Sequence, residues 1–230
     1  MKNKVLAITL FTILITNGRG YAIGGESVSI SNGTNHSSDV TNHSNERNMF
    51  LNNIPKEEIN QFVLNGTEIT LVPSNVSITG MIINNRGIFY GDTLTKAASG
   101  TKYSYSRFGI LVPENSDMLG FSQGELTTLD DMPVSNTDVK YIGDFVNYDA
   151  GLQEFTRGDM DINVNFYNKT LTIDQSSEQL NKTMKGDITG NTFTFDSGKG
   201  KGQFYGSQAA EMGGVHKDHN TVTSFGAKKQ

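Results

Sequence analysis

Short segments in which apolar and polar residues alternate follow one another closely through the carboxyl-terminal part of the chain. In one example, the dipeptide Gly190-Asn191 separates residues 184–188 from residues 193–195. A period of two residues is typical of β-strands, and turns of this kind connect antiparallel hairpins. About eight such segments occur, and hairpins in series can close into an up-and-down barrel that leaves no exposed edge. We therefore expect residues 137–230 to form an eight-stranded antiparallel β-barrel.

Residues 49–136 also have the pattern of strands and turns, and we expect a small β-rich handle domain there. A short helix is predicted over residues 53–63, because Pro55 suits a first helical turn and the apolar residues share one helical face. A polar stretch over residues 113–137 marks the boundary with the barrel. The expected fold class is therefore all-β. The strands of the handle are expected at residues 68–72, 77–83, 87–90 and 102–112.

The first 22 residues have the pattern of a secretory signal peptide. Lys2 and Lys4 precede an apolar run at residues 5–15, and small residues precede the expected cleavage after Ala22. The apolar run is too short to span a membrane as a helix. Residues 23–48 are rich in Ser, Asn, Thr and Gly, and they predict a flexible polar leader because they bury too little apolar surface to offset chain entropy.

The composition argues against several classes of function. The chain holds 24 acidic and 19 basic residues, whereas a nucleic-acid-binding protein normally needs a basic surface. It contains no cysteine, which removes disulfides, thiolate metal sites and an acylated cysteine as a lipid anchor. No nucleophile-elbow, zinc-protease or phosphate-loop motif occurs, and the adjacent pairs Asp130-Asp131 and Glu57-Glu58 suit a solvated surface. We therefore expect that the protein is not an enzyme.

A set of short motifs lies near the carboxyl terminus: Gly202-Gln203-Phe204-Tyr205-Gly206, then Ala209-Ala210-Glu211, then Gly213-Gly214, and finally Phe-Gly-Ala-Lys-Lys-Gln at 225–230. In this order they resemble the closing barrel of the transferrin-binding protein B family, and residues 186–193 resemble its preceding hairpin. Residues 105–109, Tyr-Ser-Arg-Phe-Gly, resemble the handle strand of smaller members, which include the soluble hemophilin-type hemophores. By strand alternation, Phe204 would point into the barrel and Tyr205 outward, or the reverse. We expect these residues to have a structural role.

The resemblance implies export by a surface lipoprotein assembly modulator and transfer of a captured nutrient or host protein to an outer-membrane TonB-dependent receptor. Because most members are lipoproteins and this chain has no cysteine, it resembles the soluble branch, and we expect a protein that is secreted or held at the cell surface. Two functions remain as alternatives. A hemophore-like carrier of haem or a metal ion is favoured by the small size of the chain. A host-protein-binding or colonisation factor of the transferrin-binding or factor H-binding type is favoured by the lack of a histidine in the handle.

Two groups of residues could hold haem. Tyr103, Tyr105 and Arg107 would share one face of the predicted strand 102–112, with Tyr90 on a neighbouring strand. Aromatic walls and a guanidinium group suit a flat ligand that carries propionates, although ordinary packing of the handle is an alternative. The second group lies in the leader, where His36 and His43 could supply imidazole to haem iron or to a metal ion, unless the leader is simply a solvated tail.

Two further groups are weaker candidates. His216 and His219, with Asp218 between them, could clamp a metal ion at the last hairpin turn, but a plain polar turn is the simpler interpretation. Three methionines could offer a thioether to haem iron, or could fill the core and loops instead. These are Met81, Met118 and Met132.

Overall fold

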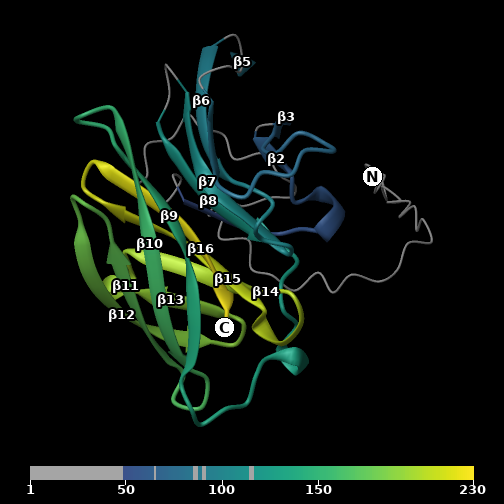
Figure 1. The fold of residues 1–230 in the computed structure, drawn as a ribbon, viewed down its shortest axis with the longest axis vertical. Coiled ribbons are helices and arrows are strands. Elements are labelled where there is room, and N and C mark those ends of the chain that lie inside the picture. Colours follow the sequence, from purple (N-terminus) through teal and green to yellow (C-terminus); the bar gives the residue numbers. More distant parts are fainter. Residues whose placement is uncertain (1–48, 65, 85–87, 90–91, 114–116) are drawn as a thin grey trace, which may run out of the picture.

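The computed structural model describes residues 49–230 apart from 65, 85–87, 90–91 and 114–116 (Figure 1). Its regular elements are β-strands and short 3-10 helices, so the predicted all-β fold class is confirmed. None of the helices in these described residues is long and apolar enough to cross a membrane. The expected signal peptide and leader, residues 1–48, lie outside the described residues.

The strands before the barrel form a six-stranded sheet and a separate hairpin. These strands are β1 (Met49–Asn53), β2 (Gln61–Leu64), β3 (Thr67–Thr70), β4 (Met81–Asn84), β5 (Ile88–Phe89), β6 (Asp92–Ser99), β7 (Ser106–Pro113) and β8 (Leu119–Gly124). The sheet order is β1-β8-β7-β6-β4, with β5 paired to β6, and β2 and β3 make the hairpin. Strand β1 runs parallel to β8, whereas the other pairs are antiparallel. A buried apolar cluster, which includes Phe62, Leu111 and Phe121, joins the hairpin to the sheet.

The following strands form a closed barrel of eight antiparallel strands, as predicted. They are β9 (Val139–Asp149), β10 (Glu154–Asn165), β11 (Thr170–Ser176), β12 (Asn181–Thr189), β13 (Thr192–Phe195), β14 (Gly200–Tyr205), β15 (Glu211–Asp218) and β16 (Thr221–Lys229). Each strand pairs with its neighbour in the sequence, and β16 pairs with β9 to close the barrel. The 3-10 helices of the chain are η2 (Lys56–Glu58), η3 (Leu129–Asp131), η4 (Asp196–Gly198) and η5 (Ser207–Ala209).

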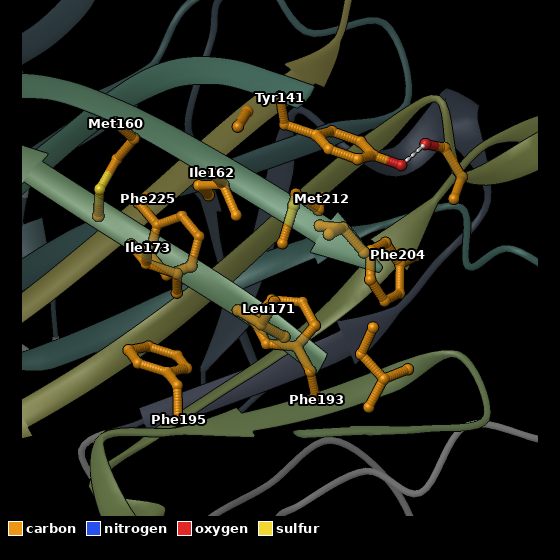
Figure 2. Packing of buried hydrophobic residues seen from close by; sticks show 14 of the residues in the cluster. Tyr141, Met160, Ile162, Leu171, Ile173, Phe193, Phe195, Phe204, Met212 and Phe225 are labelled. Atoms are coloured by element: carbon orange, nitrogen blue, oxygen red, sulfur yellow. Dashed lines mark hydrogen bonds between the residues drawn. The ribbon is translucent and has the colours of Figure 1, made fainter. Parts of the chain in front are cut away.

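The inward-facing side chains of the barrel strands form its core (Figure 2). The ring centroid of Phe193 lies 5.3 Å from that of Phe204 and 6.5 Å from that of Phe225. Gly202 makes room for this packing, because a Cβ atom at that position would lie 2.1 Å from Cζ of Phe193. Phe204 points into the barrel and Tyr205 points toward the handle, so their predicted alternation is confirmed and its sense is now defined.

A third buried cluster joins the handle sheet to the outer wall of the barrel. Phe108 and Ile110 of β7 contribute from the handle, and Val146 of β9 and Val222 of β16 contribute from the barrel. Because these barrel residues alternate with inward-facing ones, β9 and β16 are apolar on both faces. The handle therefore packs against the strands that close the barrel.

Residues 53–63 do not form the predicted helix. Strand β1 ends at Asn53, η2 is a single 3-10 turn, and β2 begins at Gln61. Ile59 and Phe62 are buried all the same. The apolar residues that suggested one helical face therefore pack from a turn and a strand.

Several strand predictions for the handle also need correction. The strand expected at residues 77–83 begins only at Met81, and β6 lies outside the predicted strands. The strand expected from residue 102 begins only at Ser106. The stretch 113–137, which was expected to be a polar connection, contains β8, and β8 lies between β1 and β7 in the sheet.

Candidate functional site

Glu211, the first residue of β15, connects the barrel to the loop that precedes β7. The residue is only 1% exposed. Its carboxylate accepts hydrogen bonds from the backbone N–H groups of Ser104 and Tyr105, at 2.6 and 3.1 Å, and from Ser106 Oγ at 2.8 Å. A buried carboxylate needs such donors to offset its lost hydration. Glu211 thereby holds the loop of the handle against the barrel.

Tyr103 lies in the same loop and is buried against the barrel. Its hydroxyl oxygen lies 2.8 Å from both Asp144 Oδ2 and the carbonyl oxygen of Gly226, and it accepts a hydrogen bond from the backbone N–H of Asp144 at 3.2 Å. Burial, together with the nearby Asp144 carboxylate, raises the pKa of Tyr103 well above its ordinary value. The phenol therefore stays protonated and acts as a hydrogen-bond donor between handle and barrel.

Arg107 is buried inside the handle. Its Nε donates to Asn60 Oδ1 at 2.9 Å, and its Nη1 donates to the carbonyl oxygens of Ser106, at 2.6 Å, and Tyr103. These contacts tie the segment before β2 to the segment before β7. The guanidinium group is thus engaged by the protein itself.

Tyr103, Tyr105 and Arg107 do not share a strand face, because β7 begins at Ser106 and both tyrosines precede it. Tyr105 is partly exposed, and Lys56 Nζ lies 4.6 Å from the centre of its ring. The structure places Tyr103 and Tyr105 at the junction of handle and barrel, and Arg107 contacts Tyr103 from inside the handle. Their role in ligand binding stays a prediction. Tyr90, His36 and His43 lie outside the described residues.

The motif residues near the carboxyl terminus meet the handle at this junction. Tyr205 Oη lies 2.7 Å from Ser122 Oγ of β8, and Gln203 Nε2 donates to the carbonyl oxygen of Asn52 at 2.9 Å. Gly226 allows close approach of the handle, because a Cβ atom there would lie 2.6 Å from the ring of Phe108. The motif therefore joins barrel and handle as well as stabilising the barrel. Sequence reasoning missed Glu211 as a junction residue, although the Ala-x-Glu motif contains it.

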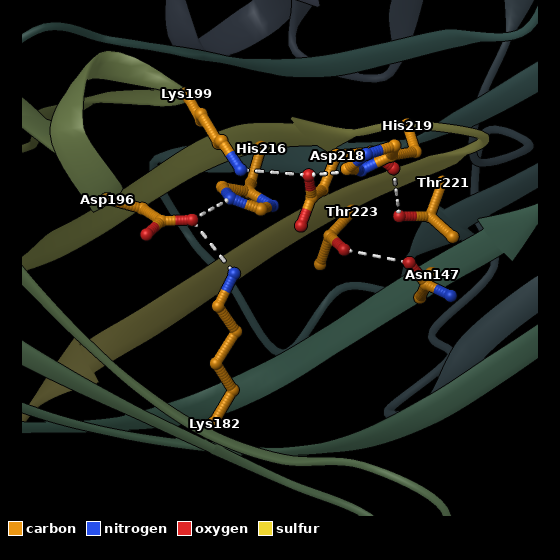
Figure 3. Close-up of polar contacts among 9 residues, drawn as sticks. All are labelled: Asn147, Lys182, Asp196, Lys199, His216, Asp218, His219, Thr221 and Thr223. Carbon is orange, nitrogen blue, oxygen red and sulfur yellow. Dashed lines mark hydrogen bonds and ion pairs between the residues drawn. The ribbon is translucent and has the colours of Figure 1, made fainter.

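A cluster of charged side chains lies at the opposite end of β15 (Figure 3). His216 points into the barrel, where its Nε2 lies 2.7 Å from Asp196 Oδ2, and Lys182 Nζ lies 2.8 Å from the same oxygen. The His216 ring stacks on Phe195 with a centroid distance of 5.7 Å. Burial lowers the pKa of His216, although the hydrogen bond with Asp196 acts in the opposite direction. These groups form a polar layer over the apolar core of the barrel.

His219 does not join His216 in one cluster. Its Nδ1 lies 2.8 Å from Asp218 Oδ1, which also accepts a hydrogen bond from Lys199 Nζ at 2.9 Å. The two histidines therefore contact different carboxylates. Within the part of the chain that the structure describes, no group of three or more His, Asp or Glu side chains is placed to hold a metal ion.

The candidate methionines occupy two different places. Met81 and Met118 are partly buried at the margin of the cluster between handle and barrel, together with Phe155. Met132 packs against the barrel core. Two of the three methionines thus lie at the same interface, on the handle side.

Residues 132–229 match the family model for the C-lobe and N-lobe β-barrels of transferrin-binding protein B. The barrel of this chain belongs to the transferrin-binding protein B barrel family. An eight-stranded closed barrel beside a smaller sheet is also the arrangement seen in the lobes of that protein.

Three similar proteins extend the comparison. Transferrin-binding protein B from serogroup B Neisseria meningitidis is 22% identical with a TM-score of 0.60, over 75% of this chain and 39% of that chain. Intact Ap-TbpB, with N and C lobes, is 26% identical with a TM-score of 0.54, over 75% of this chain and 42% of that chain. An uncharacterized protein of Haemophilus influenzae (strain Rd) is 30% identical over 196 residues, which are 75% of this chain and 66% of that protein. The chain therefore spans well under half the length of either transferrin-binding protein B.

Proposed function

We propose that this chain is an extracellular binding protein that captures a host protein connected with iron supply and catalyses no reaction. The observation that carries the proposal is the joining of a transferrin-binding protein B-type barrel to a handle sheet by buried contacts of Glu211, Tyr103 and Tyr205. A rigid body of this kind presents preformed loops to a partner and so loses little conformational freedom on binding. Transferrin-binding protein B is named for its binding of transferrin, which makes transferrin the first partner to test.

The junction favours a protein partner over haem. A haem site on the handle was expected to use Tyr103 and Arg107, but both side chains are buried and hydrogen-bonded within the protein. Freeing either of them would leave buried polar groups without partners, at a cost of about 1–3 kcal/mol for each group. These two residues therefore support the rigidity of the molecule more readily than they support a ligand.

Export through a surface lipoprotein assembly modulator and delivery to a TonB-dependent receptor belong to the same proposal. Both come from the family resemblance of the motifs at residues 105–109 and 202–230. The protein would act outside the cell or at its surface, where a host protein is accessible.

The test of the proposal is a binding measurement with purified full-length protein and iron-loaded human transferrin, with serum albumin as the control ligand. We expect saturable binding to transferrin and none to albumin, measured by biolayer interferometry. The absence of transferrin binding at micromolar concentrations would count against this function.

A hemophore-like carrier of haem is the second candidate function. It is favoured by Met81 and Met118, which are partly buried and each pack against the apolar cluster between handle and barrel. A thioether on an apolar margin suits an apolar ligand that carries iron. Addition of haem should then give a Soret band whose position changes in Met81→Leu or Met118→Leu, whereas Met132→Leu leaves it unchanged.

A further inference from the structure

The chain wraps around one end of the barrel before it enters β9. Residues 127–138, called the belt here, pass across the end shown at the bottom of Figure 1. Asn191 Nδ2 donates to the carbonyl oxygen of Thr127 at 2.7 Å, and the backbone N–H of Tyr167 donates to the carbonyl oxygen of Ser135 at 3.0 Å. Met132 packs against the barrel core. The belt is therefore fixed to the turns at this end of the barrel.

Three large apolar side chains are exposed on the belt and on the turn that contacts it. Val134 is 94% exposed, Tyr167 is 71% exposed and Leu129 is 66% exposed. Leu129 lies beside Gly190 in the turn between β12 and β13, and Val134 precedes the residue that binds Tyr167. Single exposed apolar residues are common on protein surfaces, but a group of them is typical of a binding surface.

The charged side chains of the belt itself are all acidic. Residues 127–138 contain Asp130, Asp131 and Asp138 but no lysine or arginine. Asp131 accepts hydrogen bonds from the backbone N–H and side-chain amide of Gln208, and Asp138 accepts one from the side-chain amide of Asn165. The hydrogen bonds from Gln208 favour the ionised carboxylate of Asp131 and lower its pKa. Two basic residues lie nearby: Lys169 in the turn that holds Tyr167, and Lys229, whose Nζ donates to the carbonyl oxygen of Gln208 at 3.1 Å.

We propose that Leu129, Val134 and Tyr167 form a docking surface for a protein partner that presents apolar side chains within a basic surface. The proposal rests on the proposed function, because the partner is the captured host protein. The acidic belt is complementary in charge to such a partner, and complementary charge raises the rate of association. The apolar side chains supply the central contacts of the interface.

The opposite end of the barrel offers a matched control. Leu152, in the turn between β9 and β10, is 70% exposed and therefore as accessible as Tyr167. The β9–β10 turn and the β10–β11 turn lie at opposite ends of β10, so a change at Leu152 leaves the belt untouched.

The experiment measures binding of iron-loaded transferrin to the full-length protein. We expect the triple variant Leu129→Ser, Val134→Ser, Tyr167→Ser to bind at least about tenfold more weakly than the wild type, whereas Leu152→Ser changes the affinity less than about twofold.

Asp130→Asn should slow association and reduce its dependence on salt, whereas Asp159→Asn, at an exposed position on β10, should not. Circular dichroism checks that each variant is folded, and the single variant Val134→Ser replaces the triple variant if that variant is not.

The outcomes separate the two proposals. Wild-type binding with an unaffected triple variant overturns the docking surface and leaves the proposed function standing. Failure of the wild type to bind transferrin overturns the proposed function and the docking surface together. Equal loss of binding in Leu152→Ser and in the triple variant also overturns the docking surface, because the effect would not be specific to the belt.

Discussion

Adjacent residues of β14 contribute to different parts of the molecule. Phe204 fills the barrel core, whereas the hydroxyl of Tyr205 contacts Ser122 in the handle. Burial raises the pKa of Tyr205 above its ordinary value, so the phenol stays protonated between the two parts. These two neighbouring residues thus make contacts in the core and contacts with the handle. Only the core contacts could be inferred from strand alternation.

Replacement of Glu211 by alanine should destabilise the protein. The change removes the acceptor of three hydrogen bonds and leaves the N–H groups of Ser104 and Tyr105 without a partner. We expect the free energy of unfolding to fall by roughly 2–4 kcal/mol, as measured by urea denaturation. Glu125→Ala, at an exposed position, is the control and should change it by less than about 0.5 kcal/mol. Equal unfolding midpoints for the two variants would contradict this role of Glu211.

His216 should make stability depend on pH. Burial is the main cause that lowers its pKa in the folded state below the ordinary value of 6.5. The unfolded chain therefore binds the proton more readily, and the stability that is present above about pH 6.5 is lost as the pH falls below it. The lowered pKa of Asp196 acts in the same direction at more acidic pH, because Lys182 and His216 hydrogen-bond to its ionised form.

Urea denaturation between pH 7.5 and pH 5 checks this prediction. We expect the unfolding midpoint of the wild type to fall with pH over that range, and the midpoint of His216→Gln to fall less. His219→Gln is the control, because that side chain is 89% exposed and should leave the wild-type profile unchanged. The same slope in His216→Gln and in the wild type would show that another group is responsible.

The closeness of the candidate residues could be predicted from the sequence, but their contacts could not. The sequence singled out Tyr103, Tyr105 and Arg107, and the structure gathers all three at one place. Their side-chain and backbone contacts include Asp144, Glu211 and Asn60, which lie far away in the sequence. A pattern of two-residue periodicity contains no information about such distant partners.

At the scale of elements, the strands with one solvated face were the easiest to predict. Strand β8 was missed because both of its faces are buried while four of its six residues are Gly, Ser or Gln. Ser122 contacts Tyr205, and Gln123 Nε2 donates to the carbonyl oxygens of Ile59 and Gln61. These hydrogen bonds satisfy polar side chains that would otherwise indicate an exposed loop. The predicted helix over residues 53–63 failed for a related reason, since burial of Phe62 against Phe121 stabilises a strand there.

Truncation of Phe204 tests the barrel core. Phe204 is fully buried, and its ring packs against those of Tyr141, Phe166 and Phe193. Phe204→Ala should lower the free energy of unfolding by about 3–5 kcal/mol in a denaturation experiment, because it leaves a cavity. Tyr167→Ala serves as the control, and a similar loss in that variant would mean that exposed turns limit the stability of the barrel.

At the scale of the whole molecule, the proposed division at residue 136 makes a prediction about a fragment. Residues 137–230 contain all eight barrel strands, so the fragment should show β-structure in far-ultraviolet circular dichroism. It should nevertheless unfold at lower urea concentration than the full chain, because Val146, Val222 and Tyr205 lose their contacts with the handle. A fragment without β-structure would contradict the division, and a fragment as stable as the full chain would show that the handle contributes little to the barrel.

The pairing of β16 with β9 also constrains the order of events during folding. Every other pair in the barrel joins neighbours in the sequence, whereas Tyr141 of β9 must find Lys229 of β16 at the far end of the barrel sequence. Pairs that are distant in sequence close slowly, because more chain entropy is lost before any contact forms. The last folding step should therefore be the pairing of β16 with β9, which closes a nearly complete, curled sheet into the barrel. The handle packs on β9 and β16. It should therefore slow the separation of these two strands more than it speeds their pairing.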